Sequence, residues 1–202
     1  MPLTMSQLAE RLYGILGHRD FLAMTGLANE VPIFIQTYDP ANEDAMRRTI
    51  GHLVSRLRRD GVAVGAIDLF ELVLGELEEH GLLEDFICDE PSNLRVENLE
   101  TLQNYSDPRT HLIPRLVKTI EAARSVLTLI TGSGRIYPFL RTHTILESLQ
   151  PAMLRHPVVI FFPGEYTQDL DGGSHLRLFG SIPAPVINNP YYRATNLDRY
   201  TI

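Results

Sequence analysis

The sequence predicts an α/β domain with a mostly parallel sheet of about five strands and helices on both faces. Apolar runs typical of strands alternate along the chain with segments whose apolar residues recur at helical spacing. The strand-like runs are nearly continuous in apolar residues, as expected where a parallel sheet is covered on both sides. Parallel neighbours need crossovers, so the intervening helices are expected to form right-handed βαβ units.

The first part of the chain predicts a helix, a strand and a second helix. An amphipathic helix is expected within residues 1–18 with Ser6 as its N-cap, and the first strand lies within VPIFIQTYDP, residues 31–40. Asn42 is predicted to cap the next helix, and Gly61 to end it in a left-handed conformation. The buried stripe of that helix is expected to consist of Met46, Ile50, Leu53, Val54 and Leu57.

The second strand is predicted over residues 62–69, VAVGAIDL. Gly65 within it is expected to let a neighbouring backbone come close, and Asp68 is expected to cap the helix that follows. That helix should end at Gly81 and bury Phe70, Val73, Leu74 and Leu77. Residues 89–106 carry few periodic apolar positions and predict a surface excursion.

The second part of the chain predicts one more helix and three strands. Helical spacing resumes at Leu112, Leu116, Val117 and Ile120, where Pro114 fits only in the first turn. Strands are predicted in SVLTLI (125–130), PVVIFF (157–162) and HLRLFGSI (175–182), the last as an edge strand. The intervening TQDLDGGSH predicts a hairpin connection and does not match a calcium loop.

Composition places the chain among ordinary globular proteins, with 44% hydrophobic and 21% charged residues in a length of 202. The start of the sequence shows no signal peptide, and no apolar run reaches the length of a membrane span. The single cysteine, Cys88, excludes an internal disulfide and a cysteine-built zinc site. We therefore expect a cytoplasmic protein with no membrane partner, and one domain over residues 1–202 with an extended tail at 181–202.

Charge argues against broad nucleic-acid binding, because the net charge is −7 and phosphate attraction needs a basic footprint. Basic residues nevertheless gather on one predicted helix: Arg47, Arg48, Arg56, Arg58 and Arg59. Direct DNA contact by this helix is kept as an alternative hypothesis. The preferred hypothesis is that DNA is met only indirectly, through a complex.

A conventional nucleotide site is excluded by the segment that follows the first strand. The predicted layering is like that of P-loop nucleotide hydrolases, whose Walker A loop needs glycines and a lysine between strand and helix. Here residues 37–44, TYDPANED, hold neither and add carboxylates that repel phosphate. The G-x-G-x-x-G pattern is missing there as well.

The loop Gly132-Ser133-Gly134-Arg135 leaves two interpretations open. It follows a predicted parallel strand and precedes a helical pattern with Pro138 in its expected first turn, so Arg135 and Arg141 could hold an anion there. Two glycines around a serine also make an ordinary tight turn. The G-x-S-x-G spacing of a nucleophile elbow is not matched, and His143 has no second catalytic group fixed by spacing. We predict no catalytic residues, no metal ligands and no cofactor.

Aromatic residues and arginines in the last third are of the types enriched at interface hot spots. Tyr137 lies near the glycine loop, and Tyr191, Tyr192 and Arg193 lie in the tail. The tail can bind a partner, or it can wrap its own domain and cover the sheet edge. Both interpretations can hold together.

Several segments together resemble the BrxB family, a small component of bacterial BREX phage-defence systems. They are NEVPIFIQTYDP, AIDLFELVLGELEEHGLL, LTLITGSGRIYPFLRTHTILESLQP, PVVIFFPGEY and LRLFG with YYRA. The most specific is residues 132–143, followed by Pro163 and Gly164. The resemblance implies a cytoplasmic protein in a multi-protein complex that restricts phage, without established catalytic activity. PglZ, the alkaline-phosphatase-like component, is the partner it implies.

Three hypotheses follow. The first is a non-catalytic adaptor that docks BREX proteins, above all PglZ, with residues 132–143 as the nominated surface. The second is an enzyme or sensor that binds a phosphate or nucleotide at residues 132–135. The third is direct DNA contact by the arginine-rich helix.

Overall fold

The computed structural model describes residues 3–25, 31–89, 95–149, 154–168, 174–180, 182–183 and 194–201. Its strands are β1 (Ile33–Tyr38), β2 (Val64–Asp68), β3 (Leu127–Thr131), β4 (Val158–Gln168), β5 (Ser174–Leu178), β6 (Ile182–Pro183) and β7 (Thr195–Asn196). Its α-helices are α1 (Met5–Leu16), α2 (Arg19–Leu22), α3 (Glu43–Arg59), α4 (Leu69–Glu79), α5 (Leu83–Asp89), α6 (Arg95–Tyr105), α7 (Ile113–Ala122) and α8 (Thr142–Leu149). Short turns η1 (Pro40–Asn42) and η3 (Leu197–Arg199) are 3-10 helical, and η2 (Pro108–Leu112) is π-helical.

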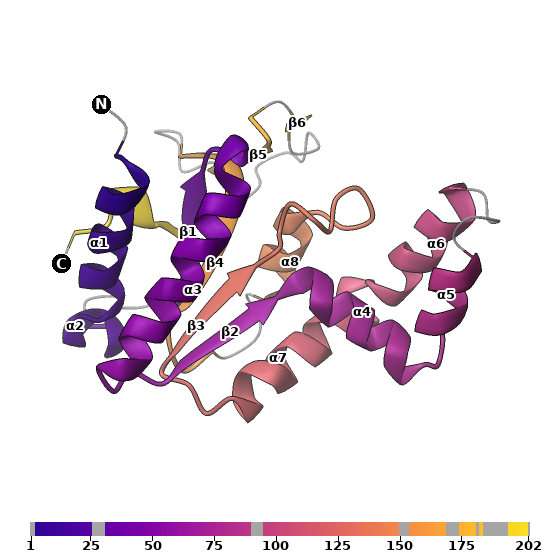
Figure 1. The fold of residues 1–202 in the computed structure, drawn as a ribbon, viewed down its shortest axis with the longest axis horizontal. Coiled ribbons are helices and arrows are strands. Elements are labelled where there is room, and N and C mark those ends of the chain that lie inside the picture. The colour runs from indigo at the N-terminus through magenta and orange to yellow at the C-terminus, as the bar shows by residue number, and fades with distance from the viewer. Residues whose placement is uncertain are drawn as a thin grey trace.

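The central sheet confirms the predicted α/β class. Its strand order is β2-β3-β4-β1-β7 and every pair along that path is parallel (Figure 1). The fifth strand is found where predicted, but it is not an edge strand: β5 folds back antiparallel on the end of β4, and β6 pairs with its other side. The parallel edge beside β1 is β7, which comes from the tail.

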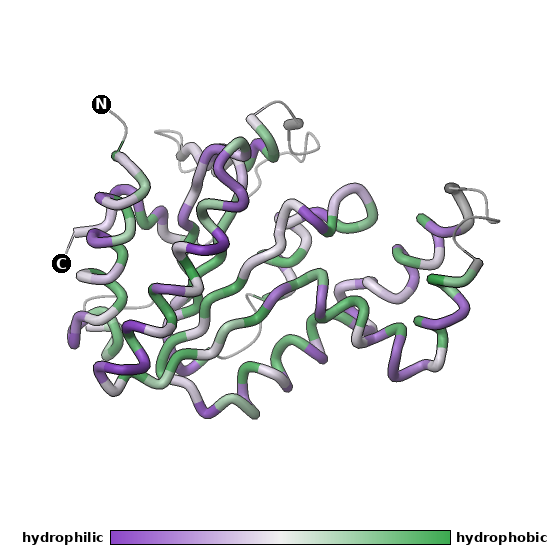
Figure 2. Tube along the Cα trace, in the orientation of Figure 1, coloured by the Kyte–Doolittle hydropathy of each residue, from purple (hydrophilic) through white to green (hydrophobic). Residues whose placement is uncertain are grey.

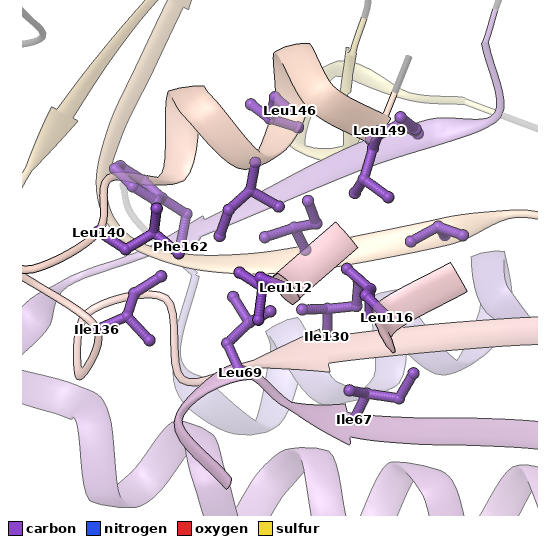
Figure 3. Close-up of a cluster of buried hydrophobic side chains, with 14 of the residues drawn as sticks. Ile67, Leu69, Leu112, Leu116, Ile130, Ile136, Leu140, Leu146, Leu149 and Phe162 are labelled. Atoms are coloured by element: carbon purple, nitrogen blue, oxygen red, sulfur yellow. The ribbon is translucent and has the colours of Figure 1, made fainter. Parts of the chain in front are cut away.

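Helices cover both faces of the sheet, as predicted. One face packs against α1, α2 and α3, through a cluster that includes Leu12, Phe21, Phe34, Leu53 and Phe161. The other face packs against α4, α7 and α8 (Figure 3). Neighbouring positions of β4 alternate between the two clusters, so the strand is apolar throughout its buried part (Figure 2).

Two predicted helix caps are wrong. Thr4, rather than Ser6, caps α1, and Gln7 completes a capping box with it. Asn42 makes no side-chain cap hydrogen bond. The chain enters α3 through η1, where Asp39 accepts a hydrogen bond from the Ala41 N–H and Pro40 fits the first turn. The predicted buried stripe of α3 is confirmed.

The helix after β2 begins where expected, and its predicted stripe is partly confirmed. Asp68 caps α4, as predicted, and Val73 and Leu77 are buried, while Phe70 and Leu74 are only partly buried. Leu69, Leu72 and Glu76 complete the buried face, and the pattern did not predict them.

The predicted surface excursion at 89–106 is helical where the structure describes it. It contains α6, which extends away from the sheet together with α5 (Figure 1).

Local expectations hold at two other positions and are corrected at a third. The close approach at Gly65 is made by side chains and not by a backbone as expected, because a Cβ there would lie 3.0 Å from the Ser125 hydroxyl oxygen. Pro114 lies in the first turn of α7. Gly61 has a φ of +87° just after α3. Among the described residues, every helix is too short or too polar to cross a membrane.

Candidate functional site

Asp68 organises the carboxyl end of the sheet between β2 and β3. Its Oδ1 accepts the backbone N–H groups of Phe70 at 2.9 Å and Glu71 at 3.3 Å, which caps α4. Its Oδ2 accepts the hydroxyl of Thr131 at 3.1 Å, at the end of β3, and pairs with the guanidinium of Arg135. One carboxylate therefore joins two strands, a helix and the glycine loop.

The two glycines of the loop are required by close packing. Gly132 has a φ of +79°, and a Cβ there would lie 2.6 Å from Asp68 Oδ1. A Cβ at Gly134 would lie 2.8 Å from Pro163 Cγ and 3.2 Å from the Phe179 ring. The loop is thus packed between the end of β2 and the start of the β4–β5 hairpin. This packing favours the interpretation of the loop as an ordinary tight turn.

The serine and arginine of this loop bond within the fold. Ser133 is buried, and its hydroxyl donates to the Phe161 carbonyl at 2.7 Å. Arg135 pairs with Asp68, and its Nη1 lies 3.6 Å from Glu71 Oε1. A guanidinium facing two carboxylates is a poor anion receptor, because the same carboxylates repel the anion.

The helix that was expected to begin directly after this loop begins further along the chain. Pro138 follows a cis peptide bond after Tyr137 and lies before α8 rather than in its first turn. The helix begins only at Thr142, so its free N–H groups are separated from Arg135 by several residues of turn. This corrects the expectation that a helix begins directly after residues 132–135 with Pro138 in its first turn.

Aromatic rings gather around the loop and form what we call the aromatic rim, which consists of Phe70, Arg135, Tyr137, Phe139, Arg141 and Phe179. The rings of Tyr137 and Phe179 meet edge to face with centroids 6.3 Å apart. The guanidinium of Arg141 lies 5.9 Å from the Tyr137 ring centroid, and that of Arg135 lies 5.2 Å from the Phe70 centroid. Phe179 is 40% exposed, a high value for a phenylalanine.

Phe179 also has an unusual backbone conformation. Its φ is +55°, in a turn that the Gly180 N–H closes on the Arg177 carbonyl at 3.3 Å. Glycine and asparagine favour that turn position, whereas a bulky aromatic residue there is strained by about 1–3 kcal/mol. Met24 and Arg124 also have a positive φ, and Phe179 differs from them in being a large aromatic residue that is 40% exposed.

The other predicted site residues separate into two groups. His143 lies in α8 and is buried, and burial lowers its pKa, so the neutral imidazole belongs to the packed interior. Tyr191, Tyr192 and Arg193 lie outside the described residues. The structure therefore places Arg135, Tyr137 and Arg141 at the rim, and Gly132, Ser133 and Gly134 in the packed loop beneath it.

The tail covers the sheet edge, as one of its two interpretations expected. Asp198 accepts hydrogen bonds from Gln36 and Thr37, both at 2.7 Å, at the carboxyl end of β1. The Tyr200 ring packs edge-on against Phe21 and Phe34. Ala194, Asn196 and Leu197 are buried, so the tail packs on the domain rather than forming a free polar extension.

Two of the arginines of α3 make contacts within the domain. Arg56 pairs with Glu10 at 2.6 Å and stacks on the Tyr13 ring at 3.5 Å. Arg58 donates to the Val64 carbonyl at 2.7 Å. Of the predicted basic cluster, Arg47, Arg48 and Arg59 are the members for which no internal contact is described, so the DNA footprint is smaller than the sequence pattern suggested.

The sequence did not predict a cluster of charged and histidine side chains around Glu76, in the last turn of α4. Glu76 is buried, and its carboxylate meets His111 from η2 at 2.8 Å and Arg115 from α7 at 3.0 Å. Burial opposes its ionisation, but the hydrogen bonds from His111 and Arg115 outweigh burial and lower the pKa of Glu76. The only sequence signal was the spacing of Glu76 and His80, four residues apart on one helix.

The fold and this site define an α/β protein with a parallel sheet, whose carboxyl end carries an aromatic and arginine surface over a structural glycine loop. The family model described as "BREX protein BrxB" matches residues 65–197. The chain is 31% identical over 200 residues to "BREX protein BrxB" of Bacillus cereus (strain H3081.97), covering 96% of this chain and 98% of that protein. The chain belongs to the BrxB family.

A second relative is more distant. The chain is 24% identical over 170 residues to "BREX protein BrxB" of Escherichia coli O9:H4 (strain HS), covering 81% of this chain and 84% of that protein. No solved structure matches the chain. The family is therefore established by sequence over nearly the whole chain, while the fold rests on the geometry described above.

Proposed function

We propose that this chain is a non-catalytic adaptor of a BREX complex and that it docks a partner protein, PglZ above all, through the aromatic rim. Membership of the BrxB family supports a role in BREX phage defence together with other BREX proteins. The observation that carries the proposal is Phe179, an aromatic side chain held 40% exposed at a positive φ. Such strain persists where function requires it.

The composition of the rim fits a protein–protein hot spot. Interface anchors are rich in aromatic residues and arginine, and they cluster near the centre of a contact. Tyr137 and Phe179 already hold one another edge to face, so little side-chain freedom is lost when a partner covers them. Arg141 next to Tyr137 adds a charge that can meet an acidic group on the partner.

The chemistry at the rim favours binding over catalysis. A nucleophile needs an exposed hydroxyl or thiol next to a base. The Ser133 hydroxyl instead donates to a backbone carbonyl and is buried. Arg135 is neutralised by Asp68, so the rim has no strong preformed anion site either.

The test is co-purification with PglZ, with Phe179→Asn as the variant. Asparagine tolerates a positive φ, so the backbone strain falls while the aromatic anchor is lost. We expect binding to weaken about 30-fold, which corresponds to about 2 kcal/mol for a hot-spot residue. The free energy of unfolding should stay within about 1 kcal/mol of the native chain.

The control is Ile87→Asn, because Ile87 is 60% exposed and lies on α5, a helix that contributes no residue to the rim. This variant should bind PglZ as the native chain does. If Ile87→Asn loses the partner and Phe179→Asn keeps it, the docking face is on the α5–α6 side. If the native chain binds no BREX protein at micromolar concentration, the adaptor proposal is wrong.

A further inference from the structure

Three potential metal ligands from two segments converge beside α4. Glu76 lies in the last turn of α4, His80 is the C-cap residue of that helix, and His111 comes from η2. One ligand atom from each residue lies within 4.8 Å of the other two. We propose that Glu76, His80 and His111 form a binding site for a divalent transition-metal ion, of which zinc is the best fit. One carboxylate and two imidazoles, with water in the fourth position, are a ligand set that zinc takes in proteins.

The distances suit a tetrahedral centre after small adjustments. Glu76 Oε1 lies 2.8 Å from His111 Nδ1 and 3.9 Å from His80 Nδ1. Ligands about 2.0–2.1 Å from a tetrahedral zinc ion stand about 3.3 Å apart. The two separations from Glu76 bracket that value, and all three ligand atoms lie within 4.8 Å of one another, so the histidine rings must move closer to each other and to the carboxylate to share one ion.

The local charge favours a cation. Glu76 is paired with Arg115 through its Oε2, and Arg115 also meets the Glu79 carboxylate at 2.7 Å. These two glutamates and one arginine together carry one net negative charge. Arg115 binds the oxygen of Glu76 that points away from the histidines, so it orients the carboxylate as an outer-shell partner does in metal sites.

The imidazoles are held by their surroundings. The Tyr105 ring lies 5.1 Å from the His80 ring and 5.6 Å from the His111 ring, measured between centroids. His80 Nδ1 lies 2.8 Å from the Glu76 carbonyl oxygen, a contact that it gives up if it binds metal through that atom. The side chain of His80 is 42% exposed and that of His111 28%, so an ion can enter from solvent.

A metal ion here would join α4 to η2, and through η2 to α7. The segments are connected by α5 and α6, which extend away from the sheet (Figure 1). An ion at Glu76 would therefore close the base of that excursion, as a structural zinc does when it ties two segments distant in sequence. The proposal is independent of docking at the aromatic rim, since Arg135 and Phe179 take no part in it.

The test uses the full chain without a histidine tag, stripped with a chelator and titrated with Zn²⁺ and then with Co²⁺. Zinc at about one equivalent should raise the unfolding temperature, and cobalt should give the intense visible absorption of a tetrahedral site. His80→Ala is the first variant because the His80 side chain is the more exposed of the two imidazoles, at 42% against 28%. It should weaken zinc binding at least about tenfold, and His111→Ala should do the same.

The matched control is His52→Ala, since His52 is also an exposed helical histidine and lies on α3. It should bind zinc as the native chain does. Equal zinc affinity in the native, His80→Ala and His111→Ala chains would overturn the proposal by showing that the ion binds elsewhere. Absence of any cobalt spectrum or thermal shift in the native chain at millimolar metal would overturn it as well.

Discussion

Replacing Gly164 with alanine is expected to destabilise the domain by about 3 kcal/mol or more. Gly164 pairs with Leu178 where the β4–β5 hairpin leaves the parallel sheet. A Cβ at this position would lie 2.0 Å from the Arg177 carbonyl oxygen. The obstructing atom belongs to the backbone of a paired strand and cannot swing aside as a side chain would, so the hairpin must open. Urea unfolding followed by far-ultraviolet circular dichroism measures the loss.

The matched control is the same substitution in a helix. Gly51 is exposed in the middle of α3, and a Cβ there would have no atom within 4 Å. Gly51→Ala should stabilise the chain by about 0.5–1 kcal/mol, because alanine has less backbone freedom to lose in a helix. Equal and small effects at Gly51 and Gly164 would show that β4 and β5 do not approach as closely as described.

Periodicity predicted the layers of this fold but not the pairing of its last strands. The buried stripe of α3 and the apolar runs of β1, β2, β3 and β4 are local patterns, and they were found where expected. Whether HLRLFGSI joins the sheet in parallel or folds back on β4 depends on the turn chemistry around Gly164 and on tertiary pairing. β7 is two residues long, too short for any period to show.

The sequence predicted where the glycine turn lies but not which side chains its residues contact. Glycine spacing located the loop, yet Arg135 is neutralised by Asp68, which lies 67 residues earlier in the sequence. Without that partner, the loop had the features of an anion site. The Glu76–His111 pair spans 35 residues and was missed for the same reason. Side-chain pairing across a sheet or between helices is set by topology, which a single sequence states only indirectly.

Among the residues that support the rim, Asp68 is expected to give the largest loss of stability when it is replaced, because its side chain makes three different interactions. Asp68→Ala removes the cap of α4, the acceptor of the Thr131 hydroxyl and the partner of Arg135. Loss of a cap alone costs about 1 kcal/mol, and Arg135, only 31% exposed, would lose its nearest carboxylate. We expect a total loss of about 3 kcal/mol in the free energy of unfolding.

Asp68→Asn separates these tasks, since asparagine caps helices about as well as aspartate but carries no charge. It should lose only about 1–2 kcal/mol, the part that belongs to the pair with Arg135. Asp107→Ala is the control for a cap that does not also hold a guanidinium group. Asp107 accepts the backbone N–H groups of Arg109 and Thr110 at the start of η2. That control should lose about 1 kcal/mol. If Asp68→Ala is no worse than Asp107→Ala, the guanidinium of Arg135 is not held by Asp68, and residues 132–135 regain a free cation for binding phosphate.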